Sequence, residues 1–312
     1  MFKPRGPLGR FPFERPPSNM TDLPADPNSI AQKAVRRART LTALPEAAAR
    51  AGRVAEDPDS SIEELGQAFS QDAALCSNLL KVANSALYGL RSEVSSIERA
   101  AVVLGRKVLR NVALAASMQT ILPRAEIHRS FSVNDLWRHS IRTAAGASML
   151  ARETGAWEAE QAFAAGLIHD LGLLVEIETD RDMLAKIMGL VGDTLPSDQR
   201  DAMRRLELEH YGADHQHFGN AMCKAWGFPQ ALRDVAAHHH DPLSLDSDSQ
   251  TLAAIVNLAE SVGNNCEHGV ISDPSGMEVE PALLACIGIS AARFGEMEEA
   301  MIQAADDIEA AF

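Results

Sequence analysis

The sequence has few cysteines and a deficit of positive charge. Its four cysteines, Cys76, Cys223, Cys266 and Cys286, include no Cys-x-x-Cys pair. This spacing indicates neither a disulfide framework nor a zinc ribbon, and it favours a reducing cytoplasm. Lysine and arginine total 29 against 43 acidic residues, giving a net charge of −14. An acidic surface repels a phosphate backbone, so we expect no direct nucleic-acid binding by the surface as a whole.

Long apolar runs are also missing. No stretch approaches the roughly 20 apolar residues of a membrane-spanning helix, and the N-terminus lacks the apolar segment of a secretory signal. We therefore expect a cytoplasmic protein without a membrane partner. The hydrophobic content of 46% is ample for one large core or two ordinary ones.

Residues 1–29 are rich in proline and carry four basic residues without helical periodicity. Such a segment cannot bury enough apolar surface to fold alone, so it is predicted to be a disordered tail. Because its prolines interrupt an amphipathic helix, a docking segment for another protein is favoured over a transit peptide.

From Ile30 onward the apolar residues recur with helical periodicity, and the fold class is predicted to be all-α. One long helix is expected from Ile97 to Ala115, capped by Ser95 or Ser96. Only residues 175–179 could pass for a strand, and a single strand cannot build a sheet.

The segment Gly166–Gly172 places His169 and Asp170 side by side in an apolar run. Burying an imidazole and a carboxylate is costly unless each has a partner, and one divalent cation would serve both. The same residues would also suit a plain helix end, with hydrogen-bonded side chains and Gly172 as the terminator.

Other histidines favour the metal interpretation. His139 lies within a predicted helix flanked by small residues, and His215 lies in the first turn of another. Of the consecutive His238, His239 and His240, two are expected to point inward, since three neighbours cannot share one helix face. Histidines carried by separate helices and joined by an Asp are how helical proteins build metal sites in their cores.

These motifs resemble the HD superfamily of metal-dependent phosphohydrolases and, more closely, its HDOD (HD-related output domain) family. The resemblance spans roughly residues 35 to 265. The matching stretches are Leu44-Pro45, Asp72–Leu75, Leu79–Gly89, Val103–Gly105, Trp137–Ser140, Ala162–Gly172, Glu209, Gly212–His215, Gly219, Trp226–Pro229 and His239–Pro242.

The resemblance implies a multi-helix HD-like bundle with an additional N-terminal helical subdomain. We accordingly expect a helical N-terminal half over residues 30–128, an HD-like half with the metal site over 129–265, and C-terminal helices over 266–312 packed on the HD-like half.

A largely retained metal site also follows from the resemblance, with Fe, Mn, Zn or Ni as the divalent ion. Its implied ligands are His139, His169, Asp170, His215, His239, His240 and Glu260. The sequence departs from the HD-GYP cyclic-di-GMP phosphodiesterases: Leu173 replaces their lysine, no Gly-Tyr-Pro triplet occurs, and Glu260 stands where HD proteins carry a closing Asp.

Two functional hypotheses follow. The first, which we favour, is a bacterial signal-transduction regulator that acts through contacts with signalling proteins. The second is a metal-dependent phosphohydrolase that takes a small phosphate ligand, such as a nucleotide or cyclic dinucleotide, and uses His169 and Asp170 at its catalytic centre. Holding phosphate requires cationic side chains, and only Arg138, Arg142 and Lys224 lie near the motifs.

Overall fold

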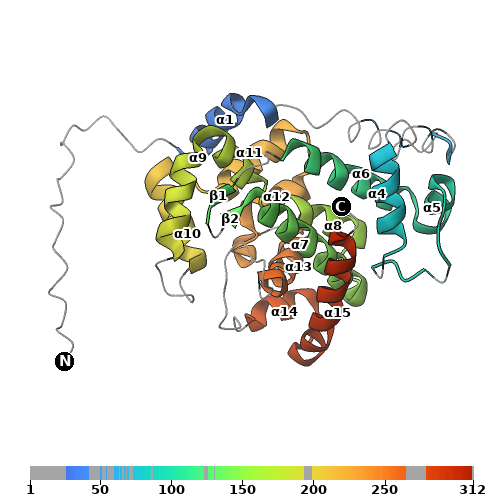
Figure 1. Ribbon diagram of the computed structural model, residues 1–312. Helices are drawn as coiled ribbons and strands as arrows, with labels where there is room; N and C mark the ends of the chain where they lie inside the picture. The colour runs from blue at the N-terminus through green and yellow to red at the C-terminus, as the bar shows by residue number, and fades with distance from the viewer. Residues whose placement is uncertain are drawn as a thin grey trace, which may run out of the picture.

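The structure, a computed structural model, describes residues 26–41, isolated positions between 50 and 69, and residues 73–310 apart from 86, 91, 123–125, 130, 193–198, 247 and 265–278. Helices dominate this part of the chain, so the all-α prediction is confirmed (Figure 1). None of the described helices combines the length and the apolar character needed to cross a membrane.

The helices and the two short strands have these bounds: α1 (Pro27–Arg37), the 3-10 helix η1 (Arg39–Leu41), α4 (Ala73–Ala83), α5 (Ile97–Leu104), α6 (Arg106–Ile121), β1 (Glu126–His128), β2 (Phe131–Ser132), α7 (Val133–Thr154), α8 (Ala159–Ile168), α9 (Leu171–Gly192), α10 (Gln199–Tyr211), α11 (His215–Ala225), α12 (Gln230–His238), the 3-10 helix η3 (Pro242–Ser244), α13 (Ser249–Asn264), α14 (Pro281–Ile287) and α15 (Ala291–Glu309).

The predicted tail is too long by three residues, because α1 begins at Pro27. The carboxylate of Asp26 accepts hydrogen bonds from the backbone N–H groups of Asn28 and Ser29, at 3.3 and 3.2 Å. Proline at the first helical position loses no hydrogen bond there. The rest of the predicted tail, residues 1–25, lies outside the described residues.

The predicted single helix from Ile97 to Ala115 is wrong, since Gly105 divides it into α5 and α6. Gly105 has a φ of +82°, a conformation that other residues rarely adopt, and its N–H ends α5 by bonding the carbonyl of Ala101. Ser96 caps α5 as expected. The break lets both α5 and α6 contact α4 and form a small helical unit.

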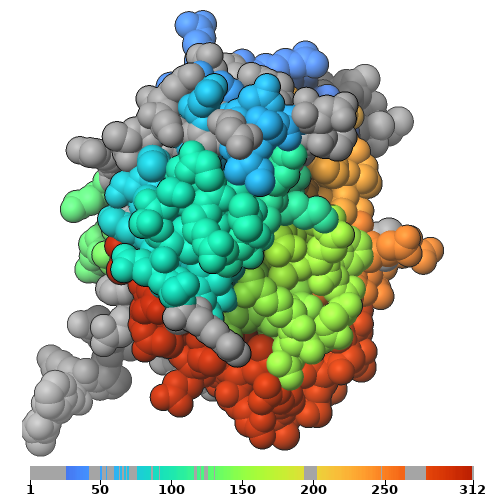
Figure 2. Space-filling model, turned by 90° about the vertical axis from the view of Figure 1, so that its right-hand side faces the viewer, coloured from blue at the N-terminus to red at the C-terminus, as the bar shows by residue number. Residues whose placement is uncertain are grey.

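A loop between α4 and α5 joins this unit to α7. The amide of Asn84 closes the loop, because it donates to the carbonyl of Val94 at 2.9 Å and accepts from its N–H at 2.7 Å. Arg152 of α7 then donates to the carbonyl of Leu87 and lies 5.1 Å from the ring centre of Tyr88. Figure 2 shows the α4–α6 unit lying directly against the surface of α8 and the C-terminal helices.

Helix α7 forms the centre of the remaining fold and contacts α8, α13 and α15 (Figure 1). It follows an antiparallel pairing of β1 with β2, and its start is fixed by a capping box between Ser132 and Asp135. Helix α9 packs against α10 and α11, while α12 lies against α11 and α13. One buried cluster of histidines lies where α7, the α8–α9 joint, the start of α11 and the end of α12 come together.

Candidate metal centre

The segment that carries His169 and Asp170 forms the joint between α8 and α9. Helix α8 ends at Ile168, the next two residues make a tight turn, and α9 begins at Leu171. His169 is fully buried and Asp170 is 7% exposed. The joint therefore points both side chains into the interior, among the neighbouring helices.

Two glycines allow those neighbouring helices to come close. A Cβ at Gly166 would lie 2.8 Å from the backbone of Thr143 and Ala144, on the helix that carries His139. A Cβ at Gly172 would lie 1.8 Å from the carbonyl oxygen of His215 at the start of α11. Each glycine thus brings one histidine-bearing helix up to the joint.

Four imidazoles converge on the carboxylate of Asp170 through their Nε2 atoms. Oδ2 of Asp170 lies 3.5 Å from Nε2 of His139 and 3.2 Å from Nε2 of His169. Its Oδ1 lies 3.4 Å from Nε2 of His239 and 3.9 Å from Nε2 of His215. Asp170 thus stands between two pairs of histidines and presents one oxygen to each pair.

The far nitrogens of two of these rings are fixed by carbonyl groups. Nδ1 of His169 lies 2.7 Å from the carbonyl oxygen of Gly166, and Nδ1 of His239 lies 3.2 Å from that of Val235. A carbonyl can only accept, so each Nδ1 must carry the hydrogen. In the neutral rings, Nε2 therefore presents a lone pair to the cluster.

This donor set fits a bound cation. The Nε2 atoms of His139 and His169 are 3.1 Å apart, and Nδ1 of His139 is buried without a hydrogen-bond partner within the described residues. Nε2 of His239 is buried and makes no hydrogen bond within the described residues. Converging lone pairs and a carboxylate are what a divalent metal ion requires.

All seven residues that the sequence points to as ligands meet here. His240 contributes Nε2, 2.9 Å from Nε2 of His215, and Glu260 joins from α13 with 3% of its surface exposed. His238 points away and contacts Ser244, so two of the three consecutive histidines face inward as predicted. Three overlapping groups have ligand atoms within 4.8 Å of one another: Asp170 with His215, His239 and His240; His139 with His169 and Asp170; His169 with His239 and Glu260.

The pKa values of the clustered residues are shifted in opposite directions. Burial and the neighbouring His169 lower the pKa of His139 to about 4. Burial also acts to lower the pKa of His215, but the Glu207 carboxylate outweighs it and raises that pKa to about 9. Although burial opposes ionisation, His169 and His239 hold the pKa of Asp170 well below its usual range. Near neutral pH the centre therefore has neutral His139 on one side and a protonated His215 on the other.

Glu207 is the residue that the sequence analysis missed. Its Oε2 accepts from Nδ1 of His215 at 2.7 Å and from the His215 backbone N–H at 3.0 Å. The motif match pointed to Glu209, which is exposed, whereas Glu207 is fully buried. Glu207 lies four residues from both Met203 and Tyr211, so the apolar face of α10 was the signal that could have identified it.

A second buried glutamate lies behind this contact. Glu176 on α9 is fully buried, and neither carboxylate oxygen has a hydrogen-bond partner within the described residues. Burial and then the nearby Glu207 raise its pKa well above the usual value. Glu176 lies one helical turn beyond Gly172, and its surroundings favour the neutral form of its carboxyl group.

The basic residues near the motifs are not presented to the cluster as phosphate ligands. Glu309 of α15 accepts from Arg138 at 2.8 Å and from Arg142 at 3.1 Å, and Asp306 forms a further ion pair with Arg142. Lys224 is exposed. The C-terminal helix therefore neutralises the two arginines that adjoin His139 in sequence.

The sequence matches the model of a known protein family. The family model for the HDOD domain matches residues 41–242. An uncharacterised protein of Treponema pallidum (strain Nichols) is 25% identical over 244 residues, which is 76% of this chain and 45% of that protein. Ribonuclease Y of Thermus thermophilus is 28% identical over 148 residues, 47% of this chain and 19% of the enzyme. The chain thus spans less than half the length of these relatives.

Solved structures share the fold. A candidate phosphohydrolase from Shewanella amazonensis SB2B superposes with a TM-score of 0.70 at 22% identity, covering 89% of this chain and 97% of that one. An HDOD domain protein with unknown function from Geobacter sulfurreducens gives 0.69 at 21% identity, covering 92% and 98%. At these identities the likeness concerns the arrangement of helices.

Proposed function

The chain belongs to the HDOD family, and from this premise we propose that it is a signal-transduction regulator whose buried histidine cluster holds a divalent metal ion and which acts through contacts with other proteins. The family match spans residues 41–242 and so includes every proposed ligand except Glu260.

One observation carries the choice of regulation over hydrolysis. The proposed metal ligands lie close together, yet the two arginines nearest His139, which could otherwise hold a phosphate ester, are paired with carboxylates. Arg138 and Arg142 both contact the Glu309 carboxylate. Phosphoryl transfer depends on positioned cationic groups that stabilise charge on the phosphate oxygens, and an arginine held by a carboxylate is poorly placed to supply one.

The ligands would form two half-sites that share Asp170. His139 and His169 face one oxygen of this carboxylate, while His215 and His239 face the other, with His240 beside His215. Imidazole with carboxylate suits Zn, Fe, Ni or Mn. When bound there, such an ion supplies Lewis acidity and, because its ligands come from several helices, binding energy for the folded state.

A second candidate function is metal-dependent hydrolysis of a phosphate ester. The convergence of His169 and Asp170 with two further histidines favours it, as does the likeness to a candidate phosphohydrolase and to ribonuclease Y. In that case Asp170 would hold the ion that activates water.

The discriminating experiment measures metal content and hydrolysis on the full chain. Elemental analysis is compared for the native protein and for His169→Ala, Asp170→Ala and His238→Ala; the last is a matched control because His238 points away from the cluster. Hydrolysis of bis(p-nitrophenyl) phosphate and cyclic-di-GMP is then assayed on the metal-loaded proteins.

The proposal expects bound metal in the native protein and in His238→Ala, little in the other two variants, and no turnover above the metal-free background. Native turnover that disappears in Asp170→Ala would instead establish the second candidate. A metal content near zero that cannot be reconstituted would remove metal binding from both functions.

A further inference from the structure

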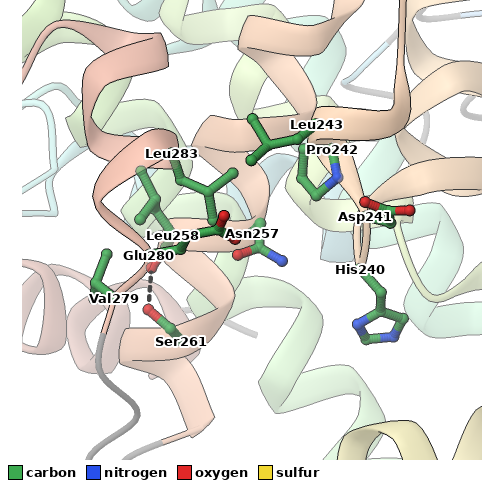
Figure 3. Close-up of a pocket in the computed structure, with 10 residues that line it drawn as sticks. All are labelled: His240, Asp241, Pro242, Leu243, Asn257, Leu258, Ser261, Val279, Glu280 and Leu283. Carbon is green, nitrogen blue, oxygen red and sulfur yellow. Dashed lines mark hydrogen bonds between the residues drawn. The ribbon is translucent and has the colours of Figure 1, made fainter.

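A cavity of about 200 Å³ adjoins the histidine cluster on the side of the C-terminal helices. Figure 3 shows its two walls: the segment from His240 to Leu243 on one side, and residues of α13 and α14 with Val279 and Glu280 on the other. The family model ends at residue 242, so the second wall comes from a part of the chain outside the match. The cavity thus lies between the matched part of the chain and the C-terminal helices.

The cavity combines an apolar lining with carboxylates. Leu243, Leu258 and Leu283 supply apolar surface, while Asp241 and Glu280 line it from opposite walls. Neither lysine nor arginine occurs among its lining residues. The preference extends through the surrounding sequence, because residues 234–292 contain no lysine or arginine and nine Asp and Glu residues.

The lining of the cavity favours a positively charged ligand over a negatively charged one. A phosphate or carboxylate entering the cavity would meet two like charges and no cation, which costs free energy. An ammonium group would be attracted by both carboxylates, and its alkyl part would bury the leucine surface. Asp241 and Glu280 are the N-cap residues of η3 and α14, but neither side chain makes a capping hydrogen bond. Both carboxylates can therefore interact with a ligand without loss of a helix cap.

His240 gives the cavity a direct connection to the candidate metal centre. It lines the cavity, while its Nε2 lies 2.9 Å from Nε2 of His215. Asn257 also lines the cavity and donates to the backbone carbonyl of His239 at 2.7 Å. A ligand in the cavity would therefore contact His240 itself and Asn257, which holds the backbone of His239.

We propose that this cavity is a binding site for a small organic amine, with the ammonium between Asp241 and Glu280 and the alkyl chain against Leu258 and Leu283. The volume suits a compact ligand, since an apolar cavity of about 150 Å³ already admits benzene. The site is defined by its own walls, so it stands whether or not the histidine cluster holds a metal ion.

The test compares three probes of equal length, n-butylammonium, 1-butanol and butanoate, by calorimetry and ligand-observed NMR on the full chain. The ammonium is expected to bind at least tenfold more tightly than the alcohol, and butanoate is expected not to bind. Equal binding of alcohol and ammonium, or any preference for butanoate, would overturn the proposal. So would the absence of ammonium binding at millimolar concentration.

Variants locate the binding. The double change Asp241→Asn with Glu280→Gln should weaken ammonium binding at least tenfold and leave 1-butanol unaffected, whereas Glu299→Gln on the exposed face of α15 should change neither. Leu283→Trp should fill the cavity and abolish binding of both probes. Ammonium binding that survives the double change in a protein with an unaltered circular dichroism spectrum would place the amine elsewhere and refute the site.

Discussion

Glu207 and His215 are joined by two hydrogen bonds to one oxygen atom: Oε2 of Glu207 accepts from both the backbone N–H and Nδ1 of His215. One carboxylate thereby fixes the start of α11 and the ring orientation of a proposed ligand. Carboxylates that support metal-binding histidines in this way keep the ring aligned and increase its basicity.

Replacing Glu207 should therefore weaken metal binding without removing a ligand. We expect Glu207→Ala to lower the affinity for Zn²⁺ by roughly 10- to 100-fold, measured by competition with a chromophoric chelator. Glu209→Ala is the matched control, because Glu209 is exposed two residues further along α10. Equal affinities for the two variants would show that Glu207 does not support the site.

Metal affinity should rise with pH up to about 9. The pKa of His215 is raised to about 9, chiefly by Glu207 against the opposing effect of burial. Below that pH a metal ion must displace the proton from Nε2, so this residue alone lowers the affinity by up to about tenfold per pH unit. Calorimetry in buffers of different ionisation enthalpy should detect protons released at pH 7.5. A pH-independent affinity between 6 and 9 would contradict this prediction.

Adding a methyl group at Gly172 should destabilise the protein. The Cβ would lie 1.8 Å from the carbonyl oxygen of His215, and backbone cannot move aside as a flexible side chain can. We expect Gly172→Ala to lower the free energy of unfolding by about 3 kcal/mol or more in urea denaturation. Gly192→Ala, in open space at the end of the same helix, should change it by less than about 0.5 kcal/mol. Similar values for both would mean that α9 and α11 can separate at little cost.

The raised pKa of Glu176 predicts that the protein loses stability as the pH rises. Burial, followed by the charge of Glu207, raises its pKa well above the ordinary value of 4.5. A carboxyl group with a raised folded-state pKa contributes stability that is fully present below its ordinary pKa and declines as the pH rises towards the raised one.

The change Glu176→Gln removes this titration. Between pH 5 and 7 the native protein should lose stability relative to Glu176→Gln at a slope of up to about 1.4 kcal/mol per pH unit, measured by urea denaturation across that range. Parallel profiles for the two proteins would show that Glu176 titrates normally. Glu178→Gln, two residues along α9 on its exposed side, provides the control.

Much of the fold and of the cluster could be predicted because local patterns determine them. Helical periodicity gave the all-α class, and the separation of His139, His169 and His215 on different helices indicated a shared site, where the structure brings them together.

Other features depend on pairing across long stretches of chain, which periodicity does not contain. Nothing local to Arg142 indicates that Asp306 and Glu309 lie against it, since these residues follow it by 164 and 167 positions. The end of α5 at Gly105 was readable from the glycine alone, but the apolar stripe continued through it and hid the break. Glu207 was missed because its partner His215 lies eight residues away on another helix, although the apolar face of α10 indicated that Glu207 is buried.

The spread of the clustered residues, from His139 on α7 to Glu260 on α13, has a consequence for how this half of the molecule opens. An ion coordinated by side chains from α7, α11 and α13 and from the α8–α9 joint would act as a non-covalent cross-link. None of these segments could then unfold locally without losing its bond to the ion. Amide hydrogens throughout this region would then exchange with solvent at a common, slow rate. After removal of the ion by a chelator, each helix would exchange at its own, different rate.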